Sequence, residues 1–274
     1  MKHCYRIVVG VAARVRGTFL AGVLLAGIAA IASAQQGTPG YEPQVGQPGK
    51  DVVWVPTPPE LVEEMLDMAK VTSSDFVIDL GSGDGRIAIA AAKRGARAMG
   101  IEYNPEMVAL SNRYASLAQV TDRVKFVKAD IFESDLSQAT VITMYLLPYL
   151  NLKLRSRLLA LKPGTRVVSH AFTMEDWSPD MHAMVGGRDA FLWIIPARVT
   201  GTWRLRYRAG AADETAEIAL TQVFQKFDGI AVLARSGSGG AKPVGLVDTA
   251  LSGSSPPGSG PPASSRRRAR RGGA

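Results

Sequence analysis

Cysteine is nearly absent from this 274-residue sequence, and histidine is scarce. The single cysteine, Cys4, lies close to the N-terminus, so the rest of the chain has neither a disulfide framework nor a thiolate metal site. Beyond residue 3 the only histidines are His170 and His182, and neither has a partner at metal-ligand spacing. We therefore expect both histidines to be structural or on the surface, and we predict no metal site.

Apolar runs long enough to cross a bilayer comfortably are also missing near the N-terminus. The uncharged run over residues 19–32 falls short of the ~18 to 20 residues that a spanning helix needs. Basic residues precede it and Ala32-Ser33-Ala34 follows it, a pattern typical of a secretory signal. We predict a signal peptide over residues 1–34 and an exported protein, periplasmic or secreted. The alternative is an uncleaved inner-membrane anchor that leaves the domain in the cytoplasm, and only then would the chain contact a membrane.

A net positive charge is missing from the middle of the chain, although the formal net charge of the whole chain is +8. Four Lys or Arg residues lie in residues 1–34 and five Arg in residues 266–274, and neither segment contains Asp or Glu. Residues 35–265 therefore carry a net charge of about −1. Charge gives no case for a nucleic-acid partner.

Composition divides the remainder of the chain. Residues 35–50 are rich in Gly, Pro and Gln and are predicted to be a flexible linker. Residues 235–274 are dominated by Gly, Ser, Pro, Ala and terminal Arg, and are predicted to be a disordered tail. Between them we expect a main domain over 51–198 and an antiparallel β extension over 199–234.

Strands and helices alternate through the main domain. The expected strands are 76–80, 96–101, 124–127, 140–145 and 166–169, with helices between them at about 61–69, 87–92, 105–117 and 150–161. Met107, Leu110, Tyr114 and Leu117 are expected on the apolar face of the third helix. This order predicts an α/β fold, a doubly wound and mostly parallel Rossmann-like sheet with its ligand crevice at the carboxyl ends of the strands.

The pattern changes near Phe191. Strands at 191–195, 199–207, 217–224 and 230–233 follow one another without helices, and Phe227-Asp228-Gly229 is expected to form a turn. The sequence therefore predicts antiparallel pairing at the sheet edge that continues into the small C-terminal β extension.

A glycine-rich loop follows the first strand, with glycines at Gly81, Gly83 and Gly85. Glycine allows a tight turn and a close approach of backbone to ligand, and the next helix presents free N–H groups at its start. A dinucleotide site would need glycine at position 86, which is Arg86, so the loop argues against NAD.

Acidic residues lie at three strand ends around this loop. Glu102 can accept both hydroxyls of a ribose, and Asp130 can accept an amino N–H of an adenine edge. Asp79 can order the loop or meet an ammonium group. Three carboxylates would repel a phosphorylated nucleotide and attract a ligand with a cationic end.

A capping pattern precedes the first strand. Thr57 can N-cap a helix with Pro58 at its first position and Glu60 three residues on, so Val55-Pro56-Thr57-Pro58 has a purely structural explanation as a helix entry.

Together these motifs resemble the class I S-adenosylmethionine-dependent methyltransferases. Asp79-Leu80-Gly81-Ser82-Gly83-Asp84-Gly85, with Glu102 and Asp130-Ile131 at these distances, carries the likeness, which covers about residues 52–196. Val55-Pro56-Thr57-Pro58, Glu102-Tyr103-Asn104-Pro105 and Leu161-Lys162-Pro163-Gly164 are similar to the branch of the ATP synthase c-subunit lysine methyltransferases and the telomeric-silencing-type histone lysine methyltransferases.

The resemblance implies a seven-stranded sheet, S-adenosyl-L-methionine as cofactor and a protein lysine as acceptor. It also implies that Thr57 and the glycine loop hold the methionine part of the cofactor, Glu102 the ribose, and Asp130 with Ile131 the adenine. The cofactor-binding residues predicted in full are Thr57, Asp79, Gly81, Ser82, Gly83, Gly85, Glu102, Asn104, Asp130 and Ile131.

Two tyrosines after the fourth strand are candidates for the acceptor channel. Tyr145 and Tyr149 can line an amine channel with ring faces and hydroxyls, or can simply be half-buried packing aromatics. The segment between them is not an Asn-Pro-Pro-Tyr type motif, which argues against a base or glutamine acceptor.

Two other functions remain open, because the cofactor is made in the cytosol and an exported enzyme would lack a supply. One is an exported, non-catalytic protein that binds an adenosyl ligand or a partner. The other is a small-molecule or lipid methyltransferase held at the membrane. The oligomeric state is not predicted.

Overall fold

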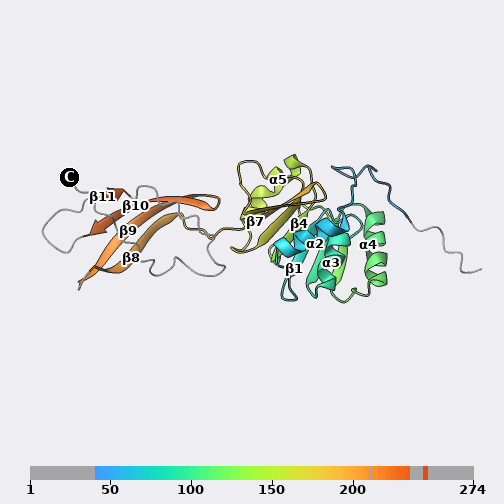
Figure 1. Ribbon diagram of the computed structural model, residues 1–274, viewed down its shortest axis with the longest axis horizontal. Helices are drawn as coiled ribbons and strands as arrows, with labels where there is room; N and C mark the ends of the chain where they lie inside the picture. The colour runs from blue at the N-terminus through green and yellow to red at the C-terminus, as the bar shows by residue number, and fades with distance from the viewer. Residues whose placement is uncertain (1–40, 210–211, 235–242, 246–274) are drawn as a thin grey trace, which may run out of the picture. The chain divides into compact units, whose positions relative to one another are not determined.

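The computed structural model describes residues 41–209, 212–234 and 243–245 (Figure 1). In these residues one helix precedes the first strand, two separate the first three strands, and a fourth follows the fourth strand. The predicted signal peptide and most of the C-terminal tail lie outside these residues. Among the described residues, no helix combines the length and the apolar character that a membrane span requires. The helices are α2 (Pro59–Met68), α3 (Arg86–Lys93), α4 (Pro105–Leu117) and α5 (Pro148–Leu159).

Seven strands form the main sheet, in the order β3-β2-β1-β4-β5-β7-β6. The first five pair in parallel, whereas β7 is antiparallel to β5 and β6 is antiparallel to β7. The predicted fold class is therefore confirmed, and β6 is the strand that the sequence patterns did not predict. The strands are β1 (Phe76–Leu80), β2 (Arg97–Glu102), β3 (Val124–Lys128), β4 (Val141–Met144), β5 (Arg166–His170), β6 (Met181–Val185) and β7 (Arg188–Ile194).

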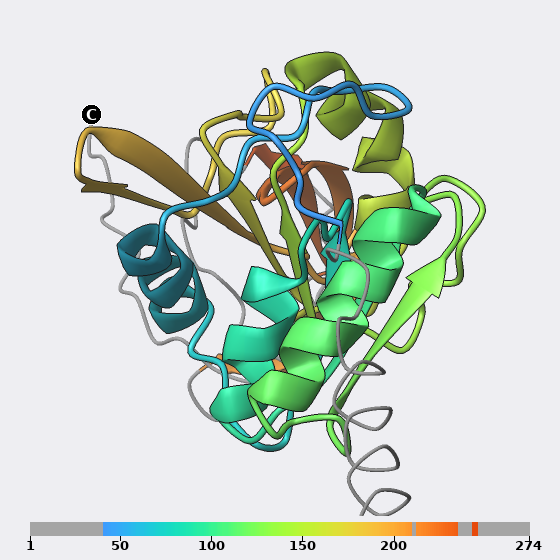
Figure 2. The ribbon, with the colours of Figure 1, turned by 90° about the vertical axis from the view of Figure 1, so that its right-hand side faces the viewer.

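Helices cover both faces of this sheet. The apolar sides of α2 and α3 pack with Val77, Val141 and Val168 in one buried cluster, and Figure 2 shows α3 and α4 side by side over that face. On the other face Leu150, Leu154 and Leu158 of α5 pack in a second cluster that includes Trp177 and Trp193. Strands β2 and β3 are added on one side of β1, and β4 and β5 on the other side. The carboxyl ends of the neighbouring strands β1 and β4 therefore flank the switch point where α/β folds bind ligands.

A second sheet follows, with strand order β11-β10-β9-β8, all antiparallel. Its strands are β8 (Gly201–Ala209), β9 (Ala212–Val223), β10 (Lys226–Ala234) and β11 (Pro243–Gly245). Strands β8, β9 and β10 form the β extension that the sequence predicts over 199–234, whereas β11 lies within residues 235–274, where the sequence predicts a disordered tail.

The predicted turn at Phe227-Asp228-Gly229 is wrong. The β9–β10 turn is Phe224-Gln225, and residues 227–229 lie inside β10. A Cβ on Gly229 would lie 2.5 Å from Leu220 Cδ2, the end of a side chain on the neighbouring strand, so this glycine marks close strand packing rather than a turn. The ring of Phe224 stacks on Trp177 at 5.7 Å between centroids.

Two local predictions about helices also differ from the structure. Thr57 does not cap α2, which begins at Pro59 with Pro58 as N-cap and no side-chain cap bond, because the Thr57 side chain turns to His170 instead. On α4 the buried residues include Met107, Leu110, Ser111 and Ala115, whereas Leu117 is 76% exposed and Tyr114 lies at the surface. The buried face of α4 thus includes the small residues Ser111 and Ala115, which the pattern of large apolar residues does not reveal.

Candidate active site

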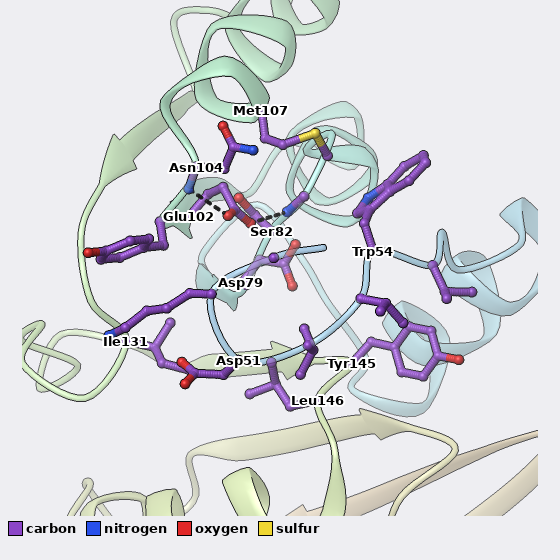
Figure 3. A pocket seen from close by; sticks show the side chains of 18 of the residues that line it. Asp51, Trp54, Asp79, Ser82, Glu102, Asn104, Met107, Ile131, Tyr145 and Leu146 are labelled. Atoms are coloured by element: carbon purple, nitrogen blue, oxygen red, sulfur yellow. Dashed lines mark hydrogen bonds between the residues drawn. The ribbon is translucent and has the colours of Figure 1, made fainter. Parts of the chain in front are cut away.

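A cavity opens at the carboxyl ends of β1, β2 and β4, at the switch point of the sheet. Ten of the predicted site residues line it: Thr57, Asp79, Gly81, Ser82, Gly83, Glu102, Asn104, Asp130, Ile131 and Tyr145. Figure 3 shows Glu102 and Asn104 on one side of the cavity and Trp54 and Tyr145 on the opposite side, with Asp79 between them. Local sequence patterns from five separate segments thus converge on one site.

Glu102 fixes the glycine loop from the end of β2. Its Oε2 accepts a hydrogen bond from the backbone N–H of Gly83 at 2.9 Å, and its Oε1 accepts one from Asn104 N–H, also at 2.9 Å (Figure 3). Asn104 in turn caps α4, because its Oδ1 accepts from Glu106 N–H at 2.8 Å. One carboxylate therefore holds the loop and the start of α4 together, and each oxygen still has a lone pair for a ligand.

The glycines of the loop are required by their backbone angles and neighbours. Gly83 has φ +54, and a Cβ there would lie 2.7 Å from Trp54 Nε1. Gly85 has φ +82 and serves as the N-cap of α3, but it does not line the cavity. A Cβ on Gly85 would meet the ring of Phe126 at 2.5 Å, so its role is to let the loop pack on β3.

Asp79 is fully buried at the end of β1. Its Oδ1 accepts a hydrogen bond from Thr143 Oγ1 at 2.7 Å. Burial raises the pKa of Asp79 to about 7, and the negative charges of Asp84 and Glu102 act in the same direction, while the Thr143 bond opposes them. A cationic group in the cavity would favour the ionised carboxylate.

The raised pKa of Asp79 makes the stability of the ligand-free protein depend on pH. Between pH ~4 and ~7 the folded state holds a proton that the unfolded chain has released, so the free energy of unfolding should fall as pH rises through this window. We expect Asp79→Asn to remove that fall, and to be more stable than the wild type at pH 8 by on the order of a few kcal/mol.

Urea denaturation at pH 5 and pH 8 tests this expectation. Asp228→Asn, a change of the same type at an exposed position on β10, serves as control and should keep the wild-type pH slope. Equal slopes for the wild type and Asp79→Asn would show that Asp79 does not titrate in this range.

An N-terminal strap, residues 46–55, forms part of the cavity wall. Backbone hydrogen bonds join Gly46 to Trp54 and Trp54 to Gln47, and Tyr149 Oη donates to Asp51 O at 2.8 Å. The linker predicted over 35–50 therefore differs from the structure at its C-terminal end, where residues 47–50 line the site. Composition could not reveal this, because the strap is joined to the rest of the domain by Tyr149, a residue distant in sequence.

Lys50 of the strap lies at the end of the cavity where Asp130 stands. Its Nζ is 2.6 Å from Asp130 Oδ2 and 4.6 Å from the ring centroid of Tyr103. Asp130 Oδ1 accepts from Phe132 N–H, and the bond with Lys50 is the main reason that the pKa of Asp130 is lowered. An amino group directed at Asp130 would share this carboxylate with Lys50.

The two tyrosines occupy different places. Tyr145 lines the cavity together with Leu146 and Phe172, whereas Tyr149 is 53% exposed and lies outside the lining. Tyr149 is the second residue of α5, and its hydroxyl is bonded to the strap. The structure thus brings Tyr145 into the cavity lining and leaves Tyr149 outside it.

Sequence reasoning missed Trp54, Lys50, Met107 and Phe172 as lining residues. Trp54 sits beside the Val55-Pro56-Thr57-Pro58 motif and could have been found by extending that motif by one residue. The others carried no local signal, since each reaches the cavity through long-range packing.

Comparison with known proteins places these features in context. Residues 79–181 match the family model described as the ANTKMT methyltransferase domain. A protein-lysine N-methyltransferase from Saccharolobus islandicus is 47% identical over 131 residues, which is 47% of this chain and 81% of that protein. The human lysine N-methyltransferase of the ATP synthase c-subunit is 34% identical over 145 residues, 53% of this chain and 61% of that protein.

A solved structure is also similar. The RNA methyltransferase from Salinibacter ruber, in complex with S-adenosyl-L-homocysteine, shares 48% identity and a TM-score of 0.52 over 53% of this chain and 96% of that chain. The chain spans only about three-fifths of the human relative, so the likeness concerns the domain that contains the cavity.

Proposed function

This chain belongs to the methyltransferase family that includes the protein-lysine N-methyltransferase of Saccharolobus islandicus, and we propose that it methylates a protein lysine with S-adenosylmethionine as cofactor. The observation that carries the proposal is the convergence of the glycine loop, Glu102 and Asp79 in one cavity at the switch point. It is supported by the 48% identical structure that contains S-adenosyl-L-homocysteine.

The residues of the cavity fit an adenosyl ligand with a charged amino-acid end. Glu102 would hold the ribose through the lone pairs that Gly83 and Asn104 leave free. Ile131 would pack against the adenine, with Asp130 at its amino group. The Ser82 hydroxyl is buried with no partner within the described residues, which suits a site that gains polar contacts on ligand binding.

The amino-acid end would lie toward Thr57 and Asp79. A buried carboxylate with a pKa of about 7 is poorly satisfied as an anion, and an α-ammonium group would stabilise its charged form. Binding of the cofactor should therefore strengthen as pH rises from 6 to 8, in the opposite direction to the stability of the ligand-free protein.

The bound cofactor supplies an electrophilic methyl carbon. The chain's own residues have to align a nucleophile and exclude water. Tyr145, Leu146 and Phe172 form an aromatic and apolar wall next to the glycine loop. Burial of an amine against this wall removes it from water, and this desolvation favours the neutral form that a lysine must present to react.

A nucleic-acid acceptor is the second candidate, and one observation favours it. The Salinibacter ruber relative, 48% identical, is named an RNA methyltransferase. Against it stands the net charge of about −1 over residues 35–265, which offers no broad electrostatic attraction for a phosphate backbone.

Calorimetry and labelled-methyl transfer with the full chain test both parts of the proposal. We expect S-adenosylmethionine to bind, and label from its methyl group to appear in protein of a total cell extract. Protease treatment should remove the label and ribonuclease should not. Label that is removed by ribonuclease and not by protease would show that the acceptor is RNA. Absence of cofactor binding would exclude a methyltransferase activity.

A further inference from the structure

His170, the last residue of β5, lies behind the cavity wall and contacts two residues that line it. It is 2% exposed, and it does not itself line the cavity. Its Nδ1 is 3.0 Å from Thr57 Oγ1, and its ring stacks on Tyr145 with 3.7 Å between centroids and 27° between planes. One side chain therefore touches both the part of the cavity assigned to the cofactor and the part assigned to the acceptor.

The contact with His170 fixes the orientation of the Thr57 hydroxyl, which lies at the end of the cavity assigned to the cofactor. Thr57 is 3% exposed, and its carbonyl oxygen accepts from Arg86 Nη1 at 2.9 Å, while Arg86 is paired with Asp84. The backbone of Thr57 is thus held by Arg86 and its side chain by His170. Burial, assisted by Arg188, lowers the pKa of His170 to about 4 against a small opposite effect of Asp189, so the imidazole that meets Thr57 is neutral.

The ring of His170 packs against Tyr145, which belongs to the wall assigned to the acceptor. Tyr145 stacks on His170 and also contacts the ring of Phe172, whose centroid is 6.2 Å from that of Tyr145. Phe172 is fixed in turn, because its N–H donates to His170 O at 2.8 Å and its carbonyl accepts from Ser169 Oγ at 2.7 Å. Ala171 between them has φ +64, a tight reversal that directs Phe172 back to the cavity.

We propose that His170 is a positioning residue that serves both halves of the site: its Nδ1 orients the Thr57 hydroxyl for the cofactor, and its ring supports Tyr145 for the acceptor amine. This inference rests on the proposed function, since it assigns the two contacts to the two substrates of a methyl transfer. It requires that the two effects of His170 be separable by substitution.

Two variants separate the contacts. His170→Asn places an amide near the position of Nδ1 and removes the ring, whereas His170→Phe keeps a ring for stacking and removes the hydrogen-bonding nitrogen. We expect His170→Phe to weaken S-adenosylmethionine binding about 5- to 10-fold, since one hydrogen bond to a buried hydroxyl is lost. We expect His170→Asn to bind the cofactor within about 2-fold of the wild type.

The acceptor side should show the reverse order. With poly-L-lysine as the methyl acceptor and saturating cofactor, His170→Asn should lose about 10-fold in kcat/KM, mainly through KM, because Tyr145 loses its stacking partner. His170→Phe, compared at its own saturating cofactor concentration, should stay within about 3-fold of the wild type.

The crossed pattern distinguishes positioning from a general packing role. If both variants weaken cofactor binding and acceptor turnover alike, or if neither changes either measurement, the proposal is overturned. If the wild type binds S-adenosylmethionine but does not methylate poly-L-lysine, the acceptor half of the proposal is overturned. The difference in cofactor binding between His170→Phe and His170→Asn would still test the hydrogen bond to Thr57. Absence of cofactor binding by the wild type overturns both proposals.

Discussion

Glu102→Ala should weaken S-adenosylmethionine binding by about 100-fold or more. The carboxylate holds Gly83 N–H and Asn104 N–H at 2.9 Å each, and it is the group assigned to the ribose hydroxyls. Removing it leaves two backbone donors without their acceptor and takes away two hydrogen bonds to a charged group, each worth roughly 1.5 to 3 kcal/mol. A 100-fold loss corresponds to about 2.7 kcal/mol, just below the roughly 3 to 6 kcal/mol that two such bonds sum to, so 100-fold is a lower estimate.

Glu102→Gln should recover little of this loss. The amide keeps the shape of the side chain, but its NH₂ group would face either Gly83 N–H or Asn104 N–H, donor against donor. Calorimetry on the full chain measures both variants. Glu106→Gln is the matched control, an exposed glutamate in the first turn of α4, and should bind as the wild type does. A Glu102→Ala variant within 5-fold of the wild type would rule out a ribose contact at this carboxylate.

The sequence predicted this part of the site because its determinants are local. A buried strand, three glycines and an acidic residue at the end of the next strand can each be recognised from a few consecutive residues. Parallel pairing then brings the ends of β1, β2 and β3 to one edge without further information. Asp79, Glu102 and Asp130, which follow from the same logic, all line the cavity.

The other wall of the site depends on contacts that no local pattern encodes. Thr57 and His170 are 113 positions apart, and Lys50 and Asp130 are 80 apart. In isolation Thr57 matched a capping motif and Lys50 belonged to a Gly- and Pro-rich segment, so local propensity favoured a different role for each. Tertiary packing overrode both, as it did at Gly229, where the glycine serves strand packing instead of a turn.

Phe126 links the glycine loop to the core, and the link explains a requirement for small residues on two segments. Its ring lies under both Gly85 and Gly100, where an added Cβ would approach ring atoms to 2.5 Å and 2.3 Å respectively. The loop is therefore shaped by a core side chain on β3 as well as by its own glycines. Loop conformation and domain stability should respond together to changes here.

Gly85→Ala should destabilise the protein by about 2 to 5 kcal/mol. Its φ of +82 costs an L-residue roughly 1 to 2 kcal/mol, and the clash with Phe126 and Ser111 adds an overpacking cost of about 1 to 3 kcal/mol. At about 2 to 4 °C per kcal/mol for a chain of this size, the melting temperature should fall by roughly 4 to 20 °C. Thermal denaturation monitored by circular dichroism measures the change.

Gly186→Ala separates the two causes, because Gly186 also has a positive φ, +57, but has nothing within 4 Å of an added Cβ. It should lose only about 1 to 2 kcal/mol. Phe126→Leu removes the outer ring atoms that meet Gly85, so Gly85→Ala should cost less in the Phe126→Leu background than in the wild type. If Gly85→Ala is no more destabilising than Gly186→Ala, or if its cost is unchanged in the Phe126→Leu background, the Phe126 ring does not constrain the loop.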